Sequence, residues 1–124
     1  MIFTFDTGML IALERRKPGA VAAFSRMTAR AIRPVVPTGV YVEWWRGRSD
    51  IREEILRAVT IEGMPEALCR AAGEALGAVE GSTLVDAIVM ASASLRGGGI
   101  VYTSDQADLR RLQDHFPTVA LIAV

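Results

Sequence analysis

The chain has 124 residues, 51% of them hydrophobic and 23% charged, and its 14 basic side chains balance 14 acidic ones. This composition excludes intrinsic disorder, and the length predicts a single domain, residues 1–124, that buries its own hydrophobic core. One cysteine, Cys69, excludes an internal disulfide, and apolar runs of about six residues are far shorter than the ~20 that cross a bilayer. Because the first residues lack a secretory pattern, we expect a cytoplasmic protein with no membrane partner.

Apolar runs typical of strands alternate with helical stretches along the chain. In chain order we expect strand 2–5, helices 7–16 and 18–31, an apolar run at 34–36, helices 37–46 and 51–57, strand 59–62, helices 65–78 and 84–96, strand 100–103, helix 105–115 and strand 119–123. The connections between strands are too long for hairpins, so the strands should pair in parallel. This order predicts the α/β class: a central parallel sheet covered on both faces by helices.

Four acidic residues stand at unusual places in this pattern. Asp6 and Asp105 each follow a predicted strand, and the carboxyl ends of parallel strands meet at one edge of a sheet, where ligands bind. Glu43 and Asp86 are lone carboxylates inside otherwise apolar stretches, and burying an unpaired charge is costly. Four acids facing one cleft would raise each other's pKa values unless a divalent cation lay between them. Oxygen ligands without a histidine or cysteine pair favour Mg²⁺ or Mn²⁺ over Zn²⁺.

Each acid also has a purely structural interpretation. Asp6 and Asp105 could each cap the helix that follows, and Asp86 could complete a capping box with Thr83. Glu43 could form an ion pair with the arginine three residues later. Caps alone do not readily account for two acids at strand ends together with two acids inside apolar helices. The combination therefore favours a site.

Four segments, spread in order over nearly the whole chain, resemble the PIN domain and, within it, the small VapC-type ribonuclease toxins of bacterial toxin–antitoxin pairs. They are DT at 6–7 followed by LIAL at 10–13, VEWWRG at 42–47, VDAI at 85–88 and TSDQADL at 103–109. The resemblance implies a PIN-like three-layer α/β/α sandwich. It also implies that Asp6, Glu43, Asp86 and Asp105 form the metal site, with Asp108 as an additional acid. Gly8 departs from the pattern, since relatives often carry asparagine or another polar residue there.

The resemblance further implies an endoribonuclease dependent on one or two Mg²⁺ or Mn²⁺ ions, which would activate a water for in-line attack on an RNA phosphodiester. We expect the hydroxyls of Thr7, Thr103 and Ser104 to orient carboxylates or the scissile phosphate, and Arg46 to contact phosphate at the rim of the cleft. The implied partners are RNA, a cognate antitoxin protein and a second copy of the chain. This chain itself should not contact DNA. A mean hydropathy of +0.29 also favours a covered apolar surface.

Two other functions remain open at this point. A catalytically inactive PIN-like module would bind RNA or protein without cleaving it, although the presence of all four acids argues against this. A different α/β phosphoryl-transfer enzyme is disfavoured, because there is no Walker-type loop and Asp6 lacks a second aspartate nearby. The zero net charge does not exclude RNA: without the four acids, 14 cations face 10 anions. That balance predicts weak RNA binding that depends on the metal.

Three other residues have plain structural interpretations. Cys69 lies in an alanine-rich helix and should be a small buried residue. Trp44 and Trp45 cannot both face the same way, so we expect one indole in the core and the other near an interface.

Overall fold

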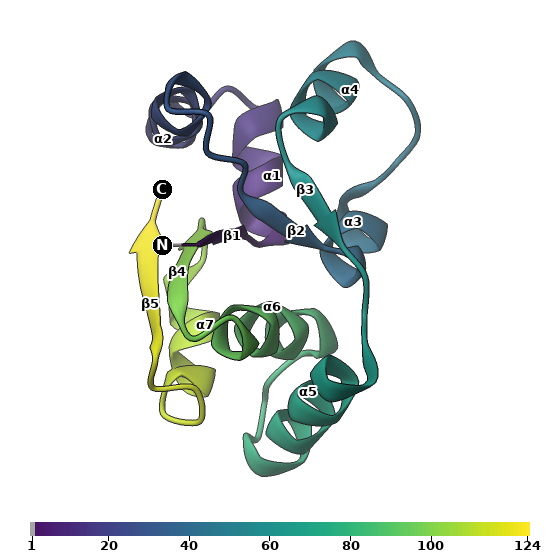
Figure 1. The fold of residues 1–124 in the computed structure, drawn as a ribbon, viewed down its shortest axis with the longest axis vertical. Helices are drawn as coiled ribbons and strands as arrows, with labels where there is room; N and C mark the ends of the chain where they lie inside the picture. The colour runs from purple at the N-terminus through teal and green to yellow at the C-terminus, as the bar shows by residue number, and fades with distance from the viewer. Residues whose placement is uncertain (1) are drawn as a thin grey trace.

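The protein is described over residues 2–124 by a computed structural model, and at its centre lies a parallel sheet (Figure 1). All strand pairings are parallel, and the strand order is β3-β2-β1-β4-β5. The strands are β1 Phe3–Phe5, β2 Val35–Pro37, β3 Thr60–Glu62, β4 Gly99–Thr103 and β5 Val119–Ala123. β1 lies in the middle, so Asp6 leaves the sheet at its centre and not at an edge strand.

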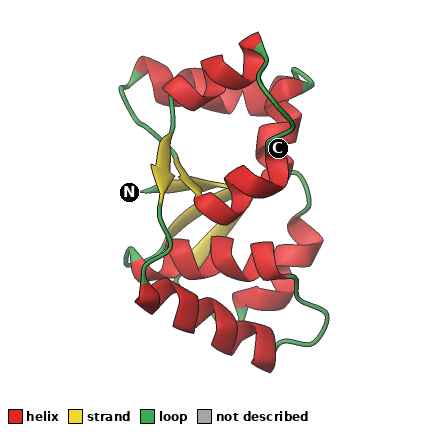
Figure 2. Ribbon diagram, turned by 90° about the vertical axis from the view of Figure 1, so that its right-hand side faces the viewer, coloured by secondary structure: helices red, strands yellow, loops and turns green. Residues whose placement is uncertain are grey.

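Helices cover both faces of the sheet, so the predicted α/β three-layer sandwich is confirmed (Figures 1 and 2). α1, α2 and α4 lie on one side of the sheet and α5, α6 and α7 on the other (Figure 1). The helices are α1 Thr7–Glu14, α2 Pro18–Ala29, α3 Thr38–Trp44, α4 Asp50–Arg57, α5 Glu66–Ala78, α6 Leu84–Leu95 and α7 Gln106–Gln113. Every predicted element is present, with ends that differ by at most two residues.

The helix ends follow local signals in the sequence. Ser49 caps α4 by accepting a hydrogen bond from the Arg52 N–H at 3.2 Å, and Pro18 occupies the first turn of α2. Glycines end α6 and turn the chain into β4. Gly98 has φ +95°, and a Cβ placed on it would lie 2.5 Å from the Thr118 carbonyl oxygen. Only glycine fits such a close approach at positive φ.

The core lies on both faces of β1 and β4 and includes the fully buried side chains Phe5, Met9, Leu10, Met90, Val101, Leu109 and Leu112. α6 is the most enclosed helix, because its residues are buried without interruption from Ala87 to Ala93. Small side chains on α6 let it pack closely against both the sheet and α5. This packing fixes the first turn of α6, which carries Asp86.

Trp44 is the indole that lies in the core, as predicted, whereas the prediction that Cys69 is buried is wrong. Trp44 is only 3% exposed, and Trp45 packs partly buried against Tyr41 at 5.6 Å between ring centroids. Cys69 is exposed. The buried stripe of α5 consists of Leu68 and two alanines at helical spacing, and Cys69 lies one position away from this stripe.

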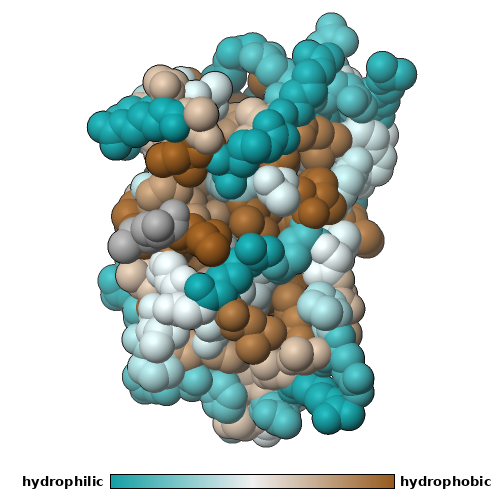
Figure 3. Space-filling model, in the orientation of Figure 1, coloured by the Kyte–Doolittle hydropathy of each residue, from teal (hydrophilic) through white to brown (hydrophobic). Residues whose placement is uncertain are grey.

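The surface is mixed in character. In Figure 3, apolar side chains reach the surface between the two helical layers, while hydrophilic side chains dominate above and below. Large exposed apolar residues include Val42 at 76% and Leu84 at 62% of their full exposure. Within residues 2–124 we find no helix with the length and apolar character needed to span a membrane.

Candidate active site

Two acids leave neighbouring strands at the same edge of the sheet. β1 and β4 are paired with Phe5 opposite Tyr102, so Asp6 and Asp105 emerge side by side beyond the carboxyl ends of these strands. The buried Thr103 hydroxyl connects them: it accepts a hydrogen bond from the Asp105 N–H at 2.9 Å and donates one to the Asp6 carboxylate. The predicted convergence of these strand ends is therefore present.

Asp6 caps α1, but the charged form of its carboxylate is destabilised by burial. It is only 6% exposed, and its Oδ1 accepts a hydrogen bond from the Met9 N–H at 2.7 Å at the start of α1. Burial raises the pKa of Asp6 from 3.8 to about 6, even though the hydrogen bonds from Thr103 and Met9 favour the charged form. The negative charges of Asp86 and Asp105 add to the increase. Capping is thus a real role of Asp6, but it leaves the carboxylate insufficiently stabilised.

Asp86 lies in the first turn of α6, three residues after the capping residue Thr83. Its N–H donates to Thr83 Oγ1 at 3.3 Å, and the Thr83 hydroxyl also hydrogen-bonds the carboxylate. Burial is the main cause that raises the pKa of Asp86, followed by the negative charges of Asp108, Glu43 and Asp105. The capping interaction is present, and Asp86 is at the same time electrostatically coupled to the other candidate acids.

The remaining acids are exposed. Asp105 stands at the capping position of α7, yet its side chain accepts no capping hydrogen bond, so the structural role considered for it is absent. Glu43, near the end of α3, forms no ion pair with Arg46 within residues 2–124. The Arg46 guanidinium instead donates to the Trp45 carbonyl at 2.7 Å. Neither Asp105 nor Glu43 therefore has a structural partner for its carboxylate in the described chain.

Together these residues form one acidic cluster, made of Asp6, Glu43, Asp86, Asp105 and Asp108, which are coupled through their charges. The cluster draws on β1, α3, α6 and the β4–α7 segment. In the part of the chain that the structure describes, no three acidic, histidine or cysteine side chains are gathered closely enough to hold a metal ion. The acidic cluster is thus a set of repelling carboxylates and not an assembled ligand shell.

The Ser104 side chain fills the space next to the α-carbon of Gly8. A Cβ placed on Gly8 would lie 2.2 Å from Ser104 Oγ and 3.4 Å from Asp6 Oδ1. The Ser104 hydroxyl thus occupies the space over the start of α1, next to the acidic cluster. Thr7 contributes a buried hydroxyl oxygen without a hydrogen-bond partner among residues 2–124.

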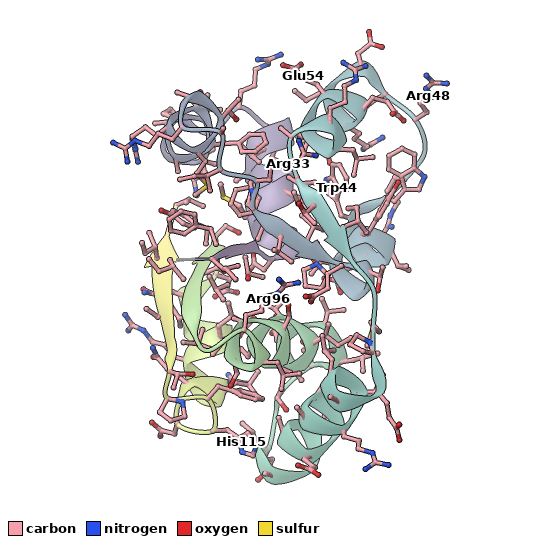
Figure 4. All side chains as sticks on the ribbon, in the orientation of Figure 1. Arg33, Trp44, Arg48, Glu54, Arg96 and His115 are labelled. Carbon is pink, nitrogen blue, oxygen red and sulfur yellow. The ribbon has the colours of Figure 1, made fainter. Side chains whose placement is uncertain are left out.

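A second polar group, missed by sequence reasoning, joins α6 to the edge of the sheet. Arg96 forms an ion pair with Glu62 of β3, and the buried Ser92 hydroxyl donates to Glu62 Oε1 at 2.5 Å. Arg96 lies between α6 and the strands in Figure 4. Ser92 and Arg96 are four residues apart, and this spacing alone indicates that their side chains lie on the same side of α6. Their partner on β3 depends on tertiary packing.

The fold is shared with chains of solved toxin–antitoxin complexes. No protein-family model matches the chain, and no curated protein matches it either. A chain of VapBC2 from Rickettsia felis, bound to a DNA fragment from their promoter, is similar with a TM-score of 0.77 at 13% identity, over 100% of this chain and 99% of that one. A toxin–antitoxin complex from Klebsiella pneumoniae gives 0.72 at 17% identity over 100% of both chains. VapBC-1 from nontypeable Haemophilus influenzae gives 0.73 at 15%, over 99% and 98%. The chain therefore has, over its whole length, the VapC-like fold found in these toxin–antitoxin complexes.

Proposed function

We propose that this protein is a Mg²⁺- or Mn²⁺-dependent endoribonuclease and the toxin of a toxin–antitoxin pair. The observation that carries the proposal is the acidic cluster at the carboxyl ends of β1 and β4, in which burial and mutual repulsion raise the pKa values of Asp6 and Asp86. Such a set is costly by itself and is stabilised by a divalent cation. The fold shared with chains of VapBC complexes supports the same function.

The donor chemistry fits a hard cation, because the acidic cluster offers only carboxylate oxygens. Asp6, Asp86 and Asp105 would hold one or two ions, with Asp108 as a further candidate ligand. A bound ion would supply electrostatic stabilisation of the charge that develops on the leaving oxygen. The Met9 N–H and the Thr103 hydroxyl fix the orientation of the Asp6 carboxylate.

Glu43 has a different role in this proposal. Its carboxylate is exposed and has no ion-pair partner among residues 2–124, so it is free to orient the attacking water and accept its proton. The exposed Ser104 hydroxyl, directly after β4, is proposed to hydrogen-bond the scissile phosphate, and the buried Thr7 hydroxyl at the start of α1 to orient a carboxylate. Arg46, next to the end of α3, is proposed to contact phosphate at the rim.

We further propose an antitoxin protein and a second copy of this chain as partners. Exposed apolar side chains flank the acidic cluster: Val42 directly precedes Glu43, and Leu84 lies two residues before Asp86. Their exposure supports a protein segment that covers the site. The Rickettsia felis and Salmonella typhimurium complexes are bound to DNA. For this system we assign DNA contact to the antitoxin and not to this chain.

One observation favours a second candidate function, a PIN-like module that binds RNA or protein without cleaving it. No ligand set of three side chains is assembled within residues 2–124. In this alternative, the exposed acids would stay apart even when cations are present.

Cleavage of cellular RNA by the purified protein separates these functions. We expect cleavage with Mn²⁺ or Mg²⁺, none with EDTA, and a loss of about 100-fold or more in Asp86→Asn. Glu74→Gln, which removes an exposed carboxylate from α5, is the matched control and should cleave normally. Activity that persists in EDTA and in Asp86→Asn would refute the proposal. RNA binding without cleavage in the wild type would favour the binding module.

A further inference from the structure

A hollow of about 480 Å³ runs along α1 and leads away from the acidic cluster. One end is bounded by Gly8 and Ser104, which lie beside Asp6. The other end is bounded by Arg15, Arg16 and the start of α2. The hollow thus joins the candidate active site to a group of cations that the proposed chemistry does not use.

The spacing of residues on α1 keeps this hollow open. Gly8, Ala12 and Arg15 follow one another at intervals of four and three residues, so they form a single stripe along the helix. The first two have the smallest side chains, and a Cβ at Gly8 would require the Ser104 hydroxyl to move. α1 has 8 residues and is therefore about 12 Å long. The cations are one helix length away from the acids.

Three consecutive cations, Arg15, Arg16 and Lys17, line the far end of the hollow, and all three are exposed. Within residues 2–124, neither Arg15 nor Arg16 forms an ion pair or a side-chain hydrogen bond. Lys17 Nζ donates to the main-chain oxygen of Val124 at 3.1 Å. By contrast, Arg96 is bound by a glutamate. Two guanidinium groups beside the hollow are therefore available to an anion.

The chain turns sharply at Arg16, beside the hollow. After α1 the Arg16 N–H donates to the Leu13 carbonyl at 3.1 Å, and the Lys17 N–H donates to the Ala12 carbonyl at 2.9 Å. This pair of hydrogen bonds places Arg16 at φ +55°, in the left-handed region where glycine ends most helices of this kind. The fold by itself would favour glycine at this position. Ala31 adopts the same conformation after α2, so the turn itself does not require an arginine, and at Arg16 it presents a guanidinium beside the hollow.

We infer that this hollow binds the sugar-phosphate backbone of the RNA strand on one side of the scissile bond, with Arg15 and Arg16 on its phosphates. The inference rests on the proposed function for the identity of the strand. Arg15 and Arg16 lie at the opposite end of α1 from Asp6, about 12 Å along the helix, so we place their contacts on phosphates next to the one at the acidic cluster. The acidic cluster repels phosphodiesters, so the strand needs cations outside it. Guanidinium groups bind phosphates in bidentate geometry.

The test measures RNA binding separately from cleavage. Fluorescence anisotropy of a labelled single-stranded oligoribonucleotide is recorded with Mn²⁺ for the wild type and for Arg15→Gln/Arg16→Gln, each carrying Glu43→Gln to prevent cleavage. We expect about 10-fold weaker binding, and a slope of log affinity against log salt that is smaller by about 1.4, which is the value for two phosphate contacts on a single strand. The matched control is Arg26→Gln/Arg30→Gln at the end of α2, where the arginines line a hollow of only about 80 Å³. The control should bind within about twofold of the wild type.

A single variant separates binding from folding. Arg16→Gly relieves the positive φ, so its thermal midpoint should increase while its RNA affinity decreases about threefold. Equal affinities of the wild type and the double variant would overturn the inference, even if the protein cleaves RNA. Tighter binding of a polyglutamate peptide than of the oligoribonucleotide would also overturn it, since the hollow would then serve an acidic protein. RNA binding that needs both arginines, without any cleavage, would refute the proposed function alone.

Discussion

Asp6→Asn tests whether the most buried acid is held in the fold at a cost. Asparagine keeps a side-chain oxygen that can accept the Met9 N–H hydrogen bond, which is 2.7 Å long with Asp6, but it carries no charge. Burial raises the pKa of Asp6 from 3.8 to about 6, and this increase corresponds to about 3 kcal/mol of folding free energy lost when the carboxylate is ionised. Without metal at pH 8, the variant should therefore be more stable than the wild type by up to about 3 kcal/mol, or roughly 10 °C in Tm.

The pH dependence follows from the direction of this shift. The folded protein binds the Asp6 proton more tightly than the unfolded chain does, because the pKa is about 6 in the fold and 3.8 outside it. Stability from this group is complete below pH 4 and is lost as pH increases toward 6 and above. The raised pKa of Asp86 acts in the same direction. The difference between Asp6→Asn and the wild type should thus be near zero at pH 4 and largest at pH 8.

Thermal unfolding followed by circular dichroism in EDTA, at steps from pH 4 to pH 8, measures this difference. Glu74→Gln serves as the control, because it removes an exposed carboxylate in the middle of α5. Its midpoint should follow that of the wild type at every pH. If Asp6→Asn were less stable than the wild type by the same amount at pH 4 and pH 8, Asp6 would act only as a helix cap. The reasoning from its burial would then be refuted.

Two further predictions concern glycines. Gly8→Ala should be less stable in urea unfolding than the same change combined with Ser104→Ala, by about 1 kcal/mol, because the new Cβ would lie 2.2 Å from Ser104 Oγ and force that hydroxyl to move. Equal losses in the single and double variants would contradict this contact. Gly98→Ala should cost more than about 2 kcal/mol, since φ is +95° and the Thr118 carbonyl blocks the new Cβ at 2.5 Å. Gly73→Ala, with no atom within 4 Å inside α5, should instead stabilise by about 0.5–1 kcal/mol, and a similar loss in both variants would contradict the account.

The order of elements could be predicted because the signals are local. Apolar periodicity, Pro18 and Pro65 before helices, and the glycines at 97–99 specify where each element begins or ends. The positions of Asp6 and Asp105 beyond two strands also follow from topology, since parallel strands place their carboxyl ends at one edge. These inferences need no knowledge of side-chain packing.

Features that depend on packing between distant segments could not be predicted. The ion pair of Arg96 with Glu62 requires the position of α6 against β3, and the space taken by Ser104 over Gly8 requires the position of β4 against α1. The prediction that Cys69 is buried is wrong for the same reason. An alanine-rich helix such as α5 offers several similar apolar stripes, and the elements that pack against the helix decide which stripe is buried.

The central claim is that the acidic cluster holds a divalent cation, and calorimetric titration with Mn²⁺ in buffers of different ionisation enthalpy tests it most directly. With a pKa of about 6, Asp6 is about half protonated at pH 6, so Mn²⁺ binding to the wild type should release about half a proton at pH 6 and almost none at pH 8. Asp6→Asn and Asp86→Asn should bind Mn²⁺ much more weakly, while Glu74→Gln should bind normally. The account would be contradicted if the wild type did not bind Mn²⁺, or if both aspartate variants bound Mn²⁺ as tightly as the wild type does.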